Sequence, residues 1–136
     1  MQTKIVELSY SDKFFAVVSS GKAEDDTIRI FNTKDALAWG VRSYPEGGKK
    51  EFPAPVFEVK APRDHTINSL KWGYLDKYLI YATDRGRIIR YDIEAKKIDD
   101  AKDVHKSEIF SIEQTIDFSM LLTCSRDGTC KLLNPQ

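Results

Sequence analysis

Apolar residues in most of this chain either alternate with polar residues or form short runs. The segments KIVELSY (4–10) and TINSLKW (66–72) alternate, while YLIYAT (78–83) is a short apolar run. Alternation with a period of two indicates a strand with one buried face, and a short apolar run bounded by turn residues is typical of a fully buried strand. Helical spacing is rarely sustained. The pattern therefore predicts an all-β fold.

Eleven strands follow from this pattern. The expected ranges are 4–10, 14–19, 27–32, 55–60, 66–72, 78–83, 87–92, 97–103, 109–115, 120–125 and 129–134. Turn-forming Gly, Asp and Ser residues stand between many of them. A chain of 136 residues is long enough for one domain with its own core and too short for two comfortable ones.

The segment 33–54 matches no strand and is predicted to be a long surface loop, because it contains Pro45 and Pro53 and is long for a connection between strands. It carries two large aromatic residues, Trp39 and Tyr44. They either anchor the loop on its own sheet or form an exposed contact for a partner, since Trp and Tyr are favoured as binding anchors.

The predicted strands repeat along the chain. Gly86 and Gly128 lie 42 positions apart (128 − 86), and the same offset relates Ile67 to Ile109, Leu79 to Leu121 and Thr83 to Ser125. A repeat of about 42 residues is typical of the four-stranded blades of a β-propeller. We therefore expect a single segment of about three blades, at 4–60, 66–103 and 109–134, in an incomplete ring. The three copies close on Phe31-Asn32, Tyr91-Asp92 and Leu133-Asn134, where a Trp-Asp pair would stand in a regular repeat.

Charge and composition exclude several classes of protein. Lys and Arg number 21 and Asp and Glu number 21, so no overall field attracts nucleic acid or an anionic membrane. No apolar run approaches the roughly 18 residues of a membrane span. Two cysteines do not make a disulfide framework, which favours a reducing, cytosolic setting.

Catalytic chemistry is scarce in this sequence. Its two histidines, His65 and His105, both precede the first strand of a repeat. The chain has no nucleophile elbow, no HExxH helix and no glycine-rich loop for phosphate. We therefore expect no enzyme, no catalytic residue and no cofactor, and a structural hydrogen-bonding role for both histidines.

Cys124 and Cys130 flank the Asp127-Gly128 turn. Even with His105 they would leave a structural zinc site one ligand short, so we expect no metal and two small buried thiols. A two-residue turn would place the cysteines on opposite faces of the hairpin. A three-residue turn with a bulge at Gly128 would place them opposite each other.

Arg85 and Arg87 form the most basic local spot, at the turn between two predicted strands. They either contact a partner such as RNA or the ribosome or belong to a solvated edge. The spot lacks the interleaved aromatic residues that stack on bases, so we expect no direct contact with nucleic acid.

The second and third copies contain the segments that resemble a known family: INSLKWG (67–73), Tyr91, VHK (104–106), TCSRD (123–127) and KL (131–132). Together they resemble the WD-repeat propeller subunit i of eukaryotic translation initiation factor 3. The first copy fits this family more loosely. Since WD repeats resemble one another, an unrelated WD-repeat adaptor is the main alternative. A ligand-binding or enzymatic propeller domain is the second, and a pocket of converging polar groups at His65 or His105 would favour it.

The resemblance implies a non-enzymatic protein–protein scaffold in the cytoplasm. Subunit i receives the C-terminal helical segment of subunit b, with subunit g also attached, and the module sits on the small ribosomal subunit. Propellers of this family have about seven blades. The resemblance therefore implies that this chain is either a fragment or an open arc that needs partners, including copies of itself.

The resemblance also implies roles for individual residues. His105, Asp127 and one of Thr123 or Ser125 match the hydrogen-bonded positions of a WD blade, while its Trp is Leu133 here. In the second copy Arg85 replaces the turn Asp, so we expect no such network there.

Acidic residues on this part of the ring hold a basic segment of subunit b in that family. Asp127 is therefore a candidate both for the blade network and for partner binding. Arg126, beside it in the turn, is a further candidate for partner binding.

Overall fold

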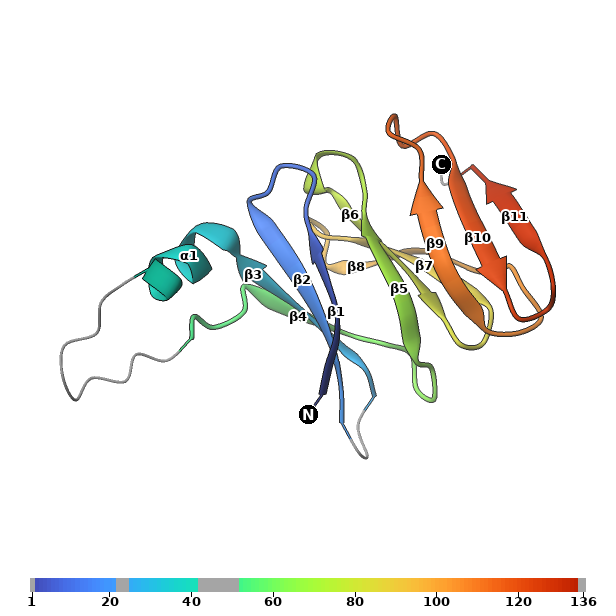
Figure 1. Cartoon of the computed structure of the whole chain (residues 1–136), viewed down its shortest axis with the longest axis horizontal. Helices are drawn as coiled ribbons and strands as arrows, with labels where there is room; N and C mark the ends of the chain where they lie inside the picture. The colour runs from blue at the N-terminus through green and yellow to red at the C-terminus, as the bar shows by residue number, and fades with distance from the viewer. Residues whose placement is uncertain (1, 22–24, 42–51, 135–136) are drawn as a thin grey trace.

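The computed structural model describes residues 2–21, 25–41 and 52–134, which form three antiparallel sheets arranged side by side (Figure 1). The first sheet contains β1 (Gln2–Leu8), β2 (Phe14–Ser20), β3 (Thr27–Asn32) and β4 (Phe57–Lys60). The second contains β5 (Ile67–Trp72), β6 (Tyr78–Thr83), β7 (Arg87–Asp92) and β8 (Lys97–Asp103). The third contains β9 (Ile109–Gln114), β10 (Leu121–Ser125) and β11 (Cys130–Leu133).

In every sheet the strands are neighbours in chain order, so each sheet is a simple meander. The predicted all-β fold is confirmed, and each observed strand overlaps a predicted one, with ends that differ by at most two residues. Burial follows the expected alternation: along β10, for example, Leu121, Thr123 and Ser125 are buried while Leu122 and Cys124 are exposed.

The segment 33–54 was expected to be a loop, and this prediction is wrong for its first part. Thr33–Val41 form the helix α1, whose first turn is capped by Asn32, since the side-chain oxygen of Asn32 accepts a 3.1 Å hydrogen bond from the backbone N–H of Asp35. The sequence contains helix formers here, but their apolar face is too short to give a periodic signal.

Trp39 of α1 is half-buried and packs on its own sheet. Its ring meets that of Phe52 edge-on at 5.2 Å between centroids, and Phe52 meets Phe31 of β3 at 5.3 Å. This arrangement favours the anchoring alternative for Trp39. Tyr44 lies outside the described residues.

Two apolar cores lie between neighbouring sheets. The core that includes the first and second sheets comprises Ala16, Val18, Ile28, Ile30, Val59, Ala61, Ile67, Leu70, Trp72, Leu79, Tyr81 and Ile89. The core between the second and third comprises Ile80, Ala82, Ile109, Ile112 and Leu121. The first strands are also joined by hydrogen bonds: Trp72 Nε1 donates to the carbonyl of Glu7 at 3.0 Å, and Gln114 Nε2 donates to the carbonyl of Trp72.

A one-residue bulge interrupts the first strand of each sheet at the same place. The extra residues are Lys4 in β1, Asn68 in β5 and Phe110 in β9. Lys4 pairs with Asp26 at 2.6 Å, and the amide of Asn68 donates to Glu108 Oε1 and to the carbonyl of Ile109 at 2.9 and 3.0 Å. A bulge turns its side chain away from the regular alternation, and here it links the strand to a neighbouring segment.

The turns after β1, β5 and β9 lie at the end of the sheets opposite to the β6–β7 and β10–β11 turns (Figure 1). They bring Tyr10, Tyr74 and Phe118 into mutual contact, with ring centroids 5.4 to 5.9 Å apart. Each aromatic residue comes from a different sheet, so the contact helps to fix the sheets relative to one another.

Candidate functional site

The β10–β11 turn is a three-residue turn, 126–128. The backbone N–H of Ser125 donates to the carbonyl of Thr129 at 3.1 Å and closes the turn. Within the turn, the backbone N–H of Gly128 donates to the carbonyl of Ser125 at 3.2 Å. Gly128 has a φ of 86°, a left-handed conformation that glycine adopts without steric cost. Of the two turns considered from the sequence, the three-residue turn is therefore the one observed, and Cys124 pairs directly with Cys130.

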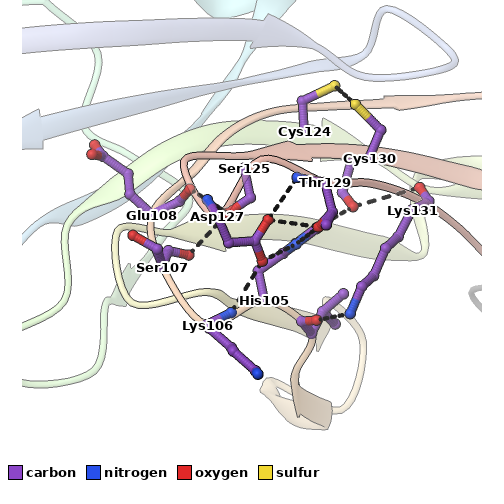
Figure 2. A network of polar contacts seen from close by, with 12 residues as sticks. His105, Lys106, Ser107, Glu108, Cys124, Ser125, Asp127, Thr129, Cys130 and Lys131 are labelled. Atoms are coloured by element: carbon purple, nitrogen blue, oxygen red, sulfur yellow. Dashed lines mark hydrogen bonds and ion pairs between the residues drawn. The ribbon is translucent and has the colours of Figure 1, made fainter.

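The carboxylate of Asp127 accepts four hydrogen bonds (Figure 2). Oδ1 accepts from the backbone N–H and the hydroxyl of Thr129 at 2.9 and 2.6 Å. Oδ2 lies 2.9 Å from His105 Nδ1 and 3.3 Å from the backbone nitrogen of Lys106. The Thr129 hydroxyl, followed by His105, holds the pKa of Asp127 far below the usual carboxyl range, so this group is ionised in the folded protein.

His105 is 5% exposed and lies between two side-chain partners. Because the Asp127 carboxylate can only accept, Nδ1 carries the proton that points to it. In the neutral ring Nε2 is then an acceptor, and the Thr123 hydroxyl, 2.6 Å away, is its donor. The three side chains form one chain of hydrogen bonds that runs from Thr123 in β10, through His105 in the loop before β9, to Asp127 in the β10–β11 turn.

Ser125 secures the same turn from its other side. Its hydroxyl donates to the carbonyl of Glu108 at 2.9 Å and accepts from the backbone N–H of Asp127 at 3.2 Å. The four residues expected to form a blade network, His105, Thr123, Ser125 and Asp127, are thus brought together. Sequence reasoning left Thr123 and Ser125 as alternatives, whereas both take part: Thr123 contacts the imidazole and Ser125 fixes the turn.

Thr129 is the network residue that the sequence analysis missed. It supplies two of the four donors to Asp127, and its hydroxyl also lies 3.1 Å from His105 Nδ1. The available signal was its position two residues after an Asp in a turn, where the backbone N–H and a hydroxyl both reach the Asp side chain.

The second sheet lacks the Asp-containing network, as expected from Arg85. At the position of Thr123, 42 residues earlier, stands Tyr81, which is fully buried. Its hydroxyl has no hydrogen-bond partner among the described residues. Burial raises the pKa of Tyr81 to about 12. This blade therefore replaces a polar contact with an aromatic core residue.

A smaller polar contact nevertheless exists there, in which His65 takes part. His65 Nδ1 lies 3.0 Å from the hydroxyl of Thr83, which also accepts from the backbone N–H groups of Arg85 and Arg87 at 3.3 Å. Burial, followed by the charge of Arg87, lowers the pKa of His65. A neutral histidine thus helps to close the β6–β7 turn without a carboxylate.

The arginines proposed to bind a partner are all engaged locally. The side chain of Arg126 is 67% exposed and lies 3.2 Å from Glu108, with its guanidinium 5.7 Å from the centre of the Phe110 ring. Arg85 Nε donates to the carbonyl of Asp64 at 3.0 Å, and Arg87 pairs with Asp103 at 3.0 Å. The Arg126 side chain is more exposed than that of Arg87, which is 37% exposed, and the Phe110 ring lies beneath its guanidinium.

A polar cleft lies beside His65, between the first and second sheets. Its lining includes Lys4, Asp26, Asp64 and Arg85. Asp26 is 5% exposed, pairs with Lys4, and accepts a 2.7 Å hydrogen bond from the backbone N–H of Ile67. Polar groups thus converge beside His65, but Asp26 already bonds to Lys4 and to the backbone of Ile67, and these contacts join the two sheets.

Residues 2–21, 25–41 and 52–134 contain neither a candidate metal site nor a candidate membrane span. No group of three or more His, Cys, Asp and Glu side chains could hold a metal ion. No described helix has both the length and the apolar character needed to cross a bilayer.

Comparison with known proteins finds a repeat in the part of the chain that carries this hydrogen-bond network. Residues 102–134, which include His105, Thr123, Ser125 and Asp127, match the family model "WD domain, G-beta repeat". The chain therefore contains a WD repeat. The three antiparallel sheets are consistent with propeller blades, and the hydrogen-bonded β10–β11 hairpin belongs to the third blade.

The WD-repeat chain is also similar to curated proteins named eukaryotic translation initiation factor 3 subunit I. It is 34% identical over 71 residues to the protein of Drosophila pseudoobscura pseudoobscura, covering 52% of this chain and 22% of the relative. It is 33% identical over 82 residues to that of Bombyx mori, covering 60% of this chain and 24% of the relative. The matched part thus spans less than a quarter of the length of these relatives.

Proposed function

We propose that this WD-repeat chain is a non-enzymatic protein–protein scaffold of the subunit I type, acting in the cytoplasm within translation initiation factor 3. The observation that carries the proposal is the similarity to subunit I over about half of the chain. The site supports it, because its histidine, hydroxyl and carboxylate groups bond to one another and build a turn. A WD scaffold works by holding such turns rigidly for a partner.

Within this scaffold Asp127 positions the turn, and Arg126 makes the contact. Four donors already surround the Asp127 carboxylate, whose side chain is 14% exposed, so a basic partner would have to displace them. Arg126 stands next to it and remains 67% exposed. Asp127 therefore affects binding through the conformation of the turn.

The proposed partners are subunits b and g, and through them the small ribosomal subunit. The end of the sheets that carries Arg126 also carries Arg85, Arg87 and Asp103, so it presents charges of both signs. Such a surface fits a helical protein segment with complementary charges better than a uniformly anionic nucleic acid. We propose that the C-terminal helical segment of subunit b is the ligand of this end.

Binding of that helical segment to Arg126→Glu and Arg126→Gln variants tests the proposal. We expect the reversal to weaken binding about tenfold, corresponding to roughly 1.4 kcal/mol, and the neutral change to weaken it less. Lys34→Glu, on the exposed surface of α1, is the matched control and should bind normally. Equal affinity of all three variants would contradict the proposed contact.

Identifying the proteins that co-purify with the chain distinguishes the proposed initiation-factor scaffold from an unrelated WD adaptor. Enrichment of initiation-factor subunits supports the scaffold in initiation factor 3. Enrichment of a different complex, with no such subunits, would overturn it.

The polar cleft at His65 is the observation that favours a second candidate, a ligand-binding domain. This candidate requires that the chain bind a small molecule and that Thr83→Val weaken this binding.

A further inference from the structure

The two cysteines face each other across the β10–β11 hairpin. Cys124 and Cys130 are direct partners in the strand register, their sulfur atoms lie 2.9 Å apart, and both side chains are exposed and unoxidised (Figure 2). The sequence analysis expected small buried thiols, so this expectation is wrong. Exposure and proximity together give the pair a chemistry that buried thiols lack.

The backbone geometry of the pair suits a disulfide. Ser125 and Thr129 form the hydrogen-bonded pair that closes the turn, so the next pair along the ladder, Cys124 and Cys130, is a non-hydrogen-bonded pair. In such pairs the Cα atoms are about 4.5 Å apart, which lies within the range that disulfides span. The sulfurs need only rotate towards each other, while the strands keep their register.

The pair also lies on the face of β10 opposite to the hydrogen-bond network. Thr123 and Ser125, which belong to the network, point into the protein, and Cys124 between them points out. A new bond between the sulfurs would therefore leave the contacts of His105 and Asp127 in place. It would join the two strands that flank the turn.

We propose that Cys124 and Cys130 are a reversible oxidation site, at which a low-molecular-weight disulfide such as oxidised glutathione closes a disulfide across the hairpin. One protein thiolate attacks a sulfur of oxidised glutathione and releases one glutathione thiolate. The second protein thiol then loses its proton and attacks the mixed disulfide, which releases the second glutathione. The protein loses two hydrogens, and the oxidised glutathione is reduced to two molecules of glutathione.

The thiol–thiol contact also sets how the reaction depends on pH. The hydrogen bond to Cys124, followed by desolvation, raises the pKa of Cys130, because both favour its protonated thiol over the thiolate. Only the thiolate reacts. Closure should therefore accelerate as the pH rises towards and through the range in which this proton is lost.

The test is to equilibrate the 136-residue chain in glutathione buffers of increasing oxidised fraction and to analyse it by intact mass and by peptide mapping without reduction. We expect a monomer lighter by two hydrogens, with residues 124 and 130 in one crosslinked peptide, and full recovery with dithiothreitol. Chains linked to each other, a chain that carries only glutathione adducts, or a chain that stays reduced in the most oxidising buffer would each overturn the proposal.

A geometric control keeps two exposed thiols on the same two strands. In the double variant Cys130→Ser, Leu132→Cys, the new thiol lies on the same face of β11, but position 132 pairs with Leu122 and is only diagonal to Cys124. We expect its disulfide to form at least tenfold less readily in the same buffer. Equal closure in both proteins would show that the wild-type register confers no preference, and it would overturn the assignment of this pair as a site.

Discussion

His105 Nδ1 lies 2.9 Å from Asp127 Oδ2, and this contact joins the loop before β9 to the turn after β10. The two residues are 22 positions apart in the sequence. The imidazole continues the connection to Thr123 in the middle of β10, so one set of hydrogen bonds links the loop, the strand and the turn. The shape of the third blade at this end depends on these few atoms.

Replacing the buried imidazole should destabilise the third blade. We expect His105→Ala to lower the free energy of unfolding by about 2 kcal/mol, because Thr123 and Asp127 lose their shared partner inside the protein. Urea unfolding followed by the fluorescence of the tryptophans measures the change. As a control, Lys106→Ala removes an exposed neighbouring side chain but keeps the backbone N–H that donates to Asp127, and should be nearly neutral.

Asp127 should make the stability depend on pH at the acidic end. Its folded-state pKa is lowered, by the Thr129 hydroxyl first, below the ordinary value of 3.8, so its contribution is present above that value and is lost as the pH falls towards the folded-state pKa. Wild type should therefore exceed Asp127→Asn in stability at neutral pH, and the difference should shrink below about pH 4. Thermal unfolding of both proteins across the acidic range measures this difference. A constant difference would argue against an ionised Asp127 in the network.

Two glycines with similar backbones should respond very differently to a methyl group. Gly128 has a φ of 86° and open space where a Cβ would be, so Gly128→Ala should cost about 1 kcal/mol from backbone strain alone. Gly86 has a φ of 79°, but a Cβ there would overlap the carbonyl group of His105. Gly86→Ala should therefore cost at least twice as much in denaturant unfolding, and similar costs would mean that the loop at His105 yields easily.

Removing the hydroxyl group of Tyr81 should stabilise the protein. Its hydroxyl is fully buried and has no hydrogen-bond partner among the described residues. Tyr81→Phe removes this desolvated group and keeps the ring in the core, so the free energy of unfolding should rise by about 1 kcal/mol. Calorimetry checks the direction. Tyr91→Phe, which changes a less buried hydroxyl in β7, is the matched control and should change the stability less.

Removing the Asp26 carboxylate, which connects the first two blades, should destabilise both. The Asp26 carboxylate is nearly buried and serves Lys4 of β1 and the backbone of Ile67 in β5. We expect Asp26→Ala to cost about 2 kcal/mol, because a buried donor and a cation lose their acceptor. Asp25→Ala, at the exposed neighbouring position, is the control. Hydrogen exchange should show the loss in both β1 and β5, and a change confined to β1 would contradict a role between blades.

The sequence predicted the strands well because most of them have a clear apolar period and end at turn residues; Lys97–Asp103 has no such period and was predicted less clearly. The offset between Gly86 and Gly128 predicted the repeat, since both glycines occupy the same left-handed turn position. The helix α1 could not be predicted in this way, because it depends on one capping side chain and on contact between Trp39 and Phe52. Such contacts join residues that no periodic pattern relates.

The candidate site was predictable to the extent that its residues occupy repeat positions. His105, Thr123, Ser125 and Asp127 follow from the WD pattern. Thr129 and the exposure of the two cysteines do not, since they depend on the length of the turn, which the pair Asp127-Gly128 left open. A single added residue in a hairpin loop changes which side chains face each other across the strands.

The bulges in β1, β5 and β9 imply that the connections between segments differ in their response to salt. The same backbone position carries a cation paired with a carboxylate at Lys4, an amide hydrogen-bonded at Asn68, and an aromatic ring below a guanidinium at Phe110. Added salt screens the 67% exposed guanidinium of Arg126 more than the ion pair between Lys4 and the nearly buried Asp26. As the ionic strength rises, the contact at Phe110 in the third blade should therefore weaken before the connection at Lys4 in the first, although the three blades share one design.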